Sequence, residues 1–109
     1  MAYDEQLAER IRRAMADAPG LYERKMFGGI AFMTSGHMTV GILGDRLMAR
    51  LGAEGTARAL ERPHVSPMDF TGPPSRTMVF VEPAGIAADA DLAAWIAAAR
   101  EFVATLPPK

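Results

Sequence analysis

The first candidates for chemistry are the two histidines of the chain, His37 and His64, and one of its aspartates, Asp69. His64 lies five residues before Asp69, and an imidazole beside a carboxylate can transfer protons or hold a metal ion. The segment around them is rich in proline and shows no third ligand, whereas metal sites need three or four. His37 follows the Ser35-Gly36 turn and is expected to be a solvated turn residue. Loop structure is the preferred interpretation of His64, and a small ligand binder or enzyme that uses His64 and Asp69 is the third hypothesis.

Other catalytic patterns are missing from the sequence. No serine stands in a Gly-x-Ser-x-Gly motif, and Gly28-Gly29 lacks the rest of a phosphate-binding loop. The glycine pair instead predicts a bulge or bend where two strands approach closely. The chain has no cysteine, which excludes disulfides, thiol catalysis and Cys-based zinc sites. No catalytic residue, metal ligand or cofactor is assigned, and the chain is not expected to be an enzyme.

Composition predicts one globular domain over residues 1–109. Half of the residues are hydrophobic, 23% are charged, and the formal net charge is -1. This near-neutral charge argues against extensive nucleic-acid binding. The polar N-terminus and the lack of a long apolar run predict a cytoplasmic protein without a membrane segment. Five basic residues come closest to forming a cluster, and they are interpreted as solvated surface: Arg10, Arg12, Arg13, Arg24 and Lys25.

An amphipathic helix is predicted near the N-terminus. Asp4 has the position of an N-cap, and Pro19-Gly20 is expected to end the helix. Glu9 and Arg13 are expected to pair on its outer face. The buried stripe is predicted to consist of Leu7, Ile11 and Met15.

Two further helices are predicted in the second half of the chain. A short one opens at Gly52 and covers about residues 53–61, with Ala57 and Leu60 facing inward. Asp89 is expected to cap the last helix. The buried side of that helix is predicted to be Leu92, Ile96, Ala99 and Val103, with Trp95 beside them.

Two short turns, Ser35-Gly36 and Gly44-Asp45, predict consecutive antiparallel hairpins between residues 30 and 51. An earlier strand over residues 24–27 and later strands at Met68-Asp69-Phe70 and Thr77–Val81 are also expected. The fold class is therefore α+β, with an antiparallel sheet packed against helices. The turns predict these apolar pairs on one face: Ile42 with Leu47, Val40 with Ala49, Met33 with Met38, and Ala31 with Val40.

The other face of this sheet is predicted to be mixed. Phe32 is expected opposite Thr39, and Thr39 opposite Arg50. Methionine most often fills irregular gaps in cores, so core packing is the first interpretation of Met48. If the face is uncovered, Phe32 and Met48 expose apolar area that needs a partner. These two residues are the predicted interaction face.

The segment Lys25-Met26-Phe27-Gly28-Gly29 and the residues up to Met33 resemble the opening strand motif of the TfoX N-terminal domain family. Further similar segments follow in order over nearly the whole chain: Gly44-Asp45 with Leu47-Met48, Arg62-Pro63-His64, Pro67 to Gly72, and Gly85 to Trp95. The resemblance implies an α-β3-α-β2-α domain similar to type III secretion chaperones.

The resemblance also implies a regulatory role. The family is named for regulators of natural competence that assist transcription with the cyclic-AMP receptor protein and carry a second, C-terminal domain, which is not expected here. It implies no catalytic residue. The roles it suggests are motif membership for Lys25 and Met26, backbone shape for Gly28 and Gly29, packing for Phe27 and Trp95, and a loop hydrogen bond for Asp69.

The sequence thus predicts a non-enzymatic protein-interaction domain with a role in transcription regulation. Its expected partner is a protein, and a homodimer is included in that expectation. The alternative is a co-regulator that contacts DNA or a DNA-bound partner directly. Phosphate contacts would then come from Arg10, Arg13, Arg24 and Lys25.

Overall fold

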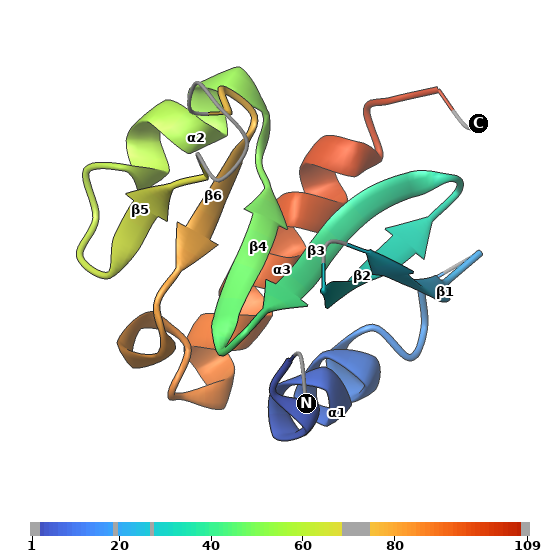
Figure 1. The fold of residues 1–109 in the computed structure, drawn as a ribbon. Coiled ribbons are helices and arrows are strands. Elements are labelled where there is room, and N and C mark those ends of the chain that lie inside the picture. Colours follow the sequence, from blue (N-terminus) through green and yellow to red (C-terminus); the bar gives the residue numbers. More distant parts are fainter. Residues whose placement is uncertain (1–2, 19, 27, 69–74, 108–109) are drawn as a thin grey trace.

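A computed structural model describes residues 3–18, 20–26, 28–68 and 75–107 of the chain. Within these residues, six strands form one antiparallel sheet in the order β1-β2-β3-β4-β6-β5, and three α-helices pack against it (Figure 1). This confirms the α+β prediction. The implied α-β3-α-β2-α order is wrong in one respect, because four strands instead of three lie between the first two helices. The likeness to secretion chaperones stays a prediction. The elements are α1 (Glu5–Ala14), β1 (Tyr22–Met26), β2 (Gly29–Thr34), β3 (His37–Leu43), β4 (Arg46–Arg50), α2 (Gly52–Ala59), β5 (Val65–Pro67), β6 (Met78–Val81), η1 (Pro83–Gly85) and α3 (Asp89–Val103).

The first helix, α1, begins as its sequence predicts. The Asp4 carboxylate accepts hydrogen bonds from the backbone N–H groups of Gln6 and Leu7, at 2.9 and 3.1 Å. The predicted stripe of Leu7, Ile11 and Met15 is buried. The predicted ion pair is wrong: Glu9 pairs with Arg12, at 2.8 Å, instead of Arg13.

The two turns set the register of the central hairpins. Ser35 and Gly36 both have positive φ, 52° and 85°, as a two-residue type I′ turn requires. The predicted pairs Ile42 with Leu47, Val40 with Ala49, and Met33 with Met38 are all present.

Beyond the Met33–Met38 pair, the register of β2 against β3 differs from the prediction. A β-bulge lies between Phe32 and Met33, so Phe32 pairs with Val40 and Ala31 pairs with Gly41. The predicted pairing of Ala31 with Val40 and of Phe32 with Thr39 is therefore wrong. Thr39 is the extra residue of the bulge, and its buried hydroxyl lies 2.7 Å from that of Thr34. We infer that this local bond favours the shifted register.

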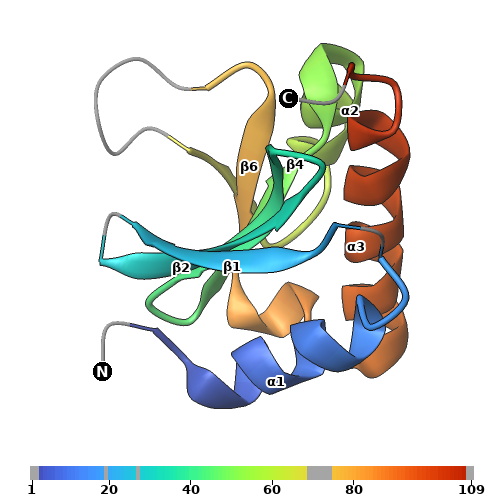
Figure 2. The same cartoon turned by 90° about the vertical axis from the view of Figure 1, so that its right-hand side faces the viewer.

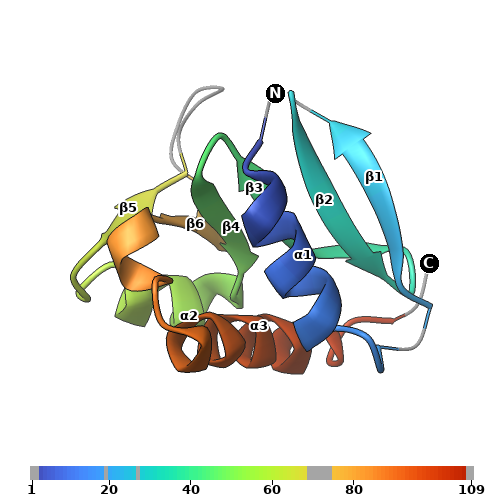
Figure 3. The ribbon, with the colours of Figure 1, turned by 90° about the horizontal axis from the view of Figure 1, so that it is seen from below.

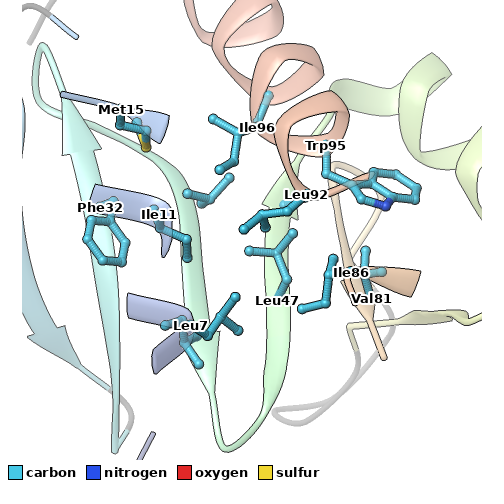
Figure 4. Packing of buried hydrophobic residues seen from close by; sticks show 14 of the residues in the cluster. Leu7, Ile11, Met15, Phe32, Leu47, Val81, Ile86, Leu92, Trp95 and Ile96 are labelled. Carbon is cyan, nitrogen blue, oxygen red and sulfur yellow. The ribbon is translucent and has the colours of Figure 1, made fainter. Parts of the chain in front are cut away.

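The bulge decides which side chains enter the core. Phe32 turns to the side of the sheet that carries the helices, where it joins Ile30, Val40 and Ile42. Figures 2 and 3 show the three helices on that side. The close view in Figure 4 shows the resulting cluster. It includes Leu7 and Ile11 from α1, Met15 directly after α1, Leu47 from β4, and Leu92, Trp95 and Ile96 from α3.

Helix α2 has a different phase from the one predicted. Its buried residues are Gly52, Thr56 and Ala59, whereas Ala57 and Leu60 are exposed. A close contact lies at its first residue, where a Cβ on Gly52 would overlap the ring of Phe102 of α3. This contact fixes which side of α2 meets α3.

Helix α3 buries the predicted face but has another N-cap. Ala88 is the N-cap and offers no side-chain hydrogen bond, and Asp89 is the first helical residue. The Asp89 carboxylate instead pairs with Arg10 of α1, at 3.1 Å. The predicted buried residues Leu92, Ile96, Ala99 and Val103 are all 6% exposed or less.

The last two strands are shorter than predicted or lie elsewhere. β5 covers Val65–Pro67, before the expected Met68-Asp69-Phe70 strand, of which Asp69 and Phe70 fall outside the described residues. β6 begins at Met78 instead of Thr77 and pairs with both β4 and β5.

Candidate functional site

His37 has a structural position in the fold. It is 7% exposed, and its Nε2 lies 2.6 Å from the carbonyl oxygen of Pro107. The prediction of a solvated turn residue is wrong, because His37 begins strand β3 and packs against the segment that follows α3. Its Nδ1 is buried and has no hydrogen-bond partner among the described residues. His37 therefore ties the end of the chain to the β2–β3 hairpin.

His64 is exposed and has a left-handed backbone, with φ of 66°. Its carbonyl oxygen accepts a hydrogen bond from the N–H of Glu82, at 2.8 Å. Asp69 lies outside the described residues, so the pairing of His64 with Asp69 stays a prediction. No group of three His, Cys, Asp or Glu in the described part of the chain could hold a metal ion.

The glycine pair of the sequence motif shapes the backbone between β1 and β2. Gly28 has φ of 77°, and a Cβ on Gly29 would overlap the carbonyl oxygen of Ile42 in β3. The close approach predicted for these glycines is thus present at Gly29. Lys25 is exposed on β1, and Met26 pairs with Gly29. Phe27 lies outside the described residues.

Trp95 packs into the core, as its predicted role requires. It is 5% exposed and belongs to the main cluster. The guanidinium carbon of Arg62 lies 4.3 Å from the centre of its ring, a cation–π arrangement. Both residues line a hollow of about 580 Å³ between α2 and α3. Its charged lining groups have both signs (Arg58, Arg62, Glu54 and Glu101), so it shows no preference for an anionic or a cationic ligand.

The predicted interaction face is closed in this structure. We call the side of the sheet away from the helices the second face; it carries Ala31, Met33, Gly41, Met48 and Phe80. Phe32 is not part of it, because the bulge places Phe32 in the core. Met48, Phe80 and Met33 are 0%, 1% and 7% exposed. Over Phe80, the Arg46 guanidinium carbon lies 3.9 Å from the ring centre. The described part of this face therefore offers no open apolar patch.

The open surface lies instead at the edge strand β1. In the sheet order β1 is the first strand, and β2 is its neighbour. Tyr22 is 47% exposed, and Glu23, Arg24 and Lys25 are exposed as well. The opposite edge, β5, is three residues long and ends at Pro67, which blunts it.

The backbone of β1 presents unused hydrogen-bonding groups. The register sets Met26 opposite Gly29, and in an antiparallel hairpin the pair that closes a loop of that length is a hydrogen-bonded pair. Such pairs alternate with non-hydrogen-bonded pairs along antiparallel strands. Glu23 and Lys25 therefore direct their N–H and C=O groups away from β2. No backbone hydrogen bond from elsewhere in the described residues reaches these groups.

Two of the five basic residues hold elements together. Arg10 donates to the carbonyl oxygens of Ile86 and Ala87, at 2.7 and 3.3 Å, besides its pair with Asp89. Arg12 donates to both carboxylate oxygens of Glu23, at 2.7 and 2.9 Å. These hydrogen bonds lower the pKa of the Glu23 carboxyl, although partial burial opposes the effect. Arg13, Arg24 and Lys25 remain exposed.

Three α-helices on one side of a six-stranded antiparallel sheet with an exposed first strand define a small α+β domain. The family model described as the TfoX N-terminal domain matches residues 13–103, and the chain belongs to this family, which is related to the regulation of competence. No curated protein and no solved structure matches the chain. Among the described helices, none has the length and hydropathy to cross a membrane.

Proposed function

We propose that this chain is a cytoplasmic, non-enzymatic protein-interaction domain that acts in transcription regulation, and that its interaction surface is the outer edge of β1. The observation that carries the proposal is the row of unused backbone groups at Glu23 and Lys25. Addition of a strand to such an edge is a common mode of protein recognition. Membership of the TfoX N-terminal domain family supports the regulatory part of the proposal.

Direct DNA binding is the weaker candidate. Of the four residues expected to contact phosphate, Arg10 is held by Asp89 and two carbonyl oxygens. Arg13, Arg24 and Lys25 are exposed, and the chain has a net charge of -1. A few scattered cations on a near-neutral domain give little of the electrostatic attraction on which DNA binding depends.

The proposal is tested by removing one backbone donor from the edge. Lys25→Pro removes the outward N–H of Lys25, which β2 does not use, whereas Lys25→Ala removes only the side chain. Purified cyclic-AMP receptor protein, RNA polymerase and duplex DNA serve as binding probes. We expect one of the two proteins to bind, with at least about tenfold loss in Lys25→Pro and about twofold or less in Lys25→Ala.

Two results would contradict the proposal. One is equal binding by the proline and alanine variants, which would place the contact elsewhere. The other is retention of DNA alone, with affinity that falls steeply as salt is raised. Unfolding curves of both variants show whether a loss of binding reflects a loss of fold.

A further inference from the structure

We propose that the strand that adds to β1 is β1 of a second copy of this chain, in the antiparallel register that sets Glu23 of one copy opposite Lys25 of the other. The inference rests on the interaction role proposed above for this edge: the second copy and a regulator use the same backbone groups of Glu23 and Lys25, so they compete for the edge. The result is a symmetric dimer in which two sheets join into one.

The backbone fits this arrangement. Only Glu23 and Lys25 direct their N–H and C=O groups outward within β1, as the pairing of β1 with β2 requires. A twofold axis through Arg24, perpendicular to the sheet, sets each Glu23 opposite the Lys25 of the other copy. Both pairs are then hydrogen-bonded pairs, in which the two residues exchange two bonds.

The side chains favour the same register. Glu23 and Lys25 pair with Phe32 and Ile30 of the core, so both project to the side of the sheet that carries the helices. Across the new junction they bring opposite charges together twice. Arg12 holds the Glu23 carboxylate in place, at 2.7 Å, which lowers the entropy lost when a lysine of the second copy approaches.

Neighbouring registers are less favourable. A shift of two residues sets Glu23 opposite Glu23 or Lys25 opposite Lys25, and like charges directly opposite each other are destabilising. A shift of one residue exchanges the two faces of the added strand. The charge order of β1 therefore selects one register out of the few that the strand length allows.

One contact in the dimer is unfavourable. Arg24 lies on the twofold axis and faces Arg24 of the second copy, on the second face of the sheet. This repulsion weakens the dimer. A variant that removes the charge of Arg24 is therefore expected to tighten the dimer. Within the described residues, the opposite edge consists of the three-residue β5, which ends at Pro67 and offers no second long strand, so we expect the assembly to close at two copies.

The test measures self-association by sedimentation from about 1 µM to 1 mM protein, at low salt. We expect Lys25→Glu, which sets two glutamates opposite each other, to weaken the dimer at least about tenfold, and Lys25→Pro to do the same. Arg24→Gln relieves the repulsion on the axis and is expected to tighten the dimer about two- to fivefold. Arg13→Glu, with the same charge change on exposed α1 surface, is the matched control and should leave the dimer unchanged.

A mixing experiment tests the register itself. Lys25→Glu and Glu23→Lys are each expected to be monomeric alone, because each sets like charges opposite each other. Their mixture restores two opposite-charge pairs and is expected to form a heterodimer. Failure of the mixture to associate, while the wild type does, would overturn the register.

The proposal is wrong if the wild type stays monomeric at about 1 mM, if Lys25→Glu dimerises as the wild type does, or if Arg24→Gln weakens the dimer. A monomeric wild type that still loses a regulator through Lys25→Pro would refute the dimer and leave the proposed function standing. A dimer that behaves as expected but binds no regulator would refute the proposed function and leave the dimer standing.

Discussion

At the scale of single residues, the position of Gly29 shows how closely two strands approach. The carbonyl oxygen of Ile42 occupies the place where a Cβ of residue 29 would lie. The oxygen belongs to the backbone and the backbone fixes the position of a Cβ, so neither can turn aside as the end of a flexible side chain would. Gly28 differs, because the space beside it is open and only its φ of 77° favours glycine.

The two glycines are therefore expected to respond differently to alanine. Gly28→Ala carries the cost of a left-handed backbone, about 1–2 kcal/mol in the free energy of unfolding. Gly29→Ala forces β2 and β3 apart and is expected to cost more than about 3 kcal/mol, or to prevent folding. Urea unfolding of both variants measures the difference. Equal losses would show that backbone freedom, and not the contact with Ile42, explains the glycine pair.

His37 shows why sequence reasoning misplaced one residue. A histidine directly after a Ser-Gly turn is exposed when nothing passes over the turn. Here the chain beyond α3 returns to this hairpin, and Pro107 accepts the His37 hydrogen bond at 2.6 Å. Seventy residues separate the two partners. The residues next to His37 in the sequence do not indicate a contact with a segment so distant along the chain.

At the scale of elements, the β2–β3 bulge is the feature that most changes the candidate site. Turn residues predicted the register close to each turn, since Ser35-Gly36 and Gly44 determine which residues pair beside them. The bulge was not predictable, because either register sets apolar residues opposite each other. The bond between Thr34 and Thr39 lies at the bulge, and the bulge places Phe32 in the core instead of on the predicted interaction face.

A double-mutant cycle tests that bond. Thr34→Val or Thr39→Val alone leaves one buried hydroxyl unpaired and is expected to cost about 1–3 kcal/mol. The double variant removes both hydroxyls and is expected to cost clearly less than the sum of the two. Costs that simply add would show that the two hydroxyls do not depend on each other and do not hold the bulge.

The Arg12–Glu23 pair joins α1 to β1 and predicts a dependence on pH. Because the pKa of the Glu23 carboxyl is lowered in the folded chain, chiefly by its hydrogen bonds with Arg12, the pair stabilises the fold above the ordinary glutamate pKa of about 4.3. That stability is lost as the pH falls through the lower, folded value. Arg12→Gln is expected to cost about 0.2–1 kcal/mol at pH 7, since the pair is partly exposed.

The free energy of unfolding that Arg12→Gln loses is expected to become smaller as the pH is lowered. Urea unfolding of Arg12→Gln and of the wild type between about pH 7 and pH 2 measures this difference. Arg13→Gln, which removes an exposed cation from the same helix, is the control and should show no such trend. A difference that stays constant down to the lowest pH would show that Arg12 acts through packing instead of through Glu23.

At the scale of the whole molecule, one cluster connects all the elements on the helix side of the sheet. It contains residues of α1, α2 and α3 together with β2, β3, β4 and β6. Leu7 and Trp95 lie far apart within it in Figure 4, yet both are 5% exposed or less. A chain of 109 residues in which one cluster joins three helices to the sheet is expected to unfold in one cooperative step.

Trp95 makes this expectation measurable, because it is the single tryptophan of the chain. Urea unfolding followed by its fluorescence should coincide with unfolding followed by far-ultraviolet circular dichroism. Leu7→Ala, at the α1 end of the cluster, is expected to cost about 2–5 kcal/mol and to shift both curves equally, whereas the exposed Gln6→Ala should shift neither. If Leu7→Ala shifts the circular dichroism curve but leaves the fluorescence curve in place, α1 unfolds separately and the core is not one cooperative unit.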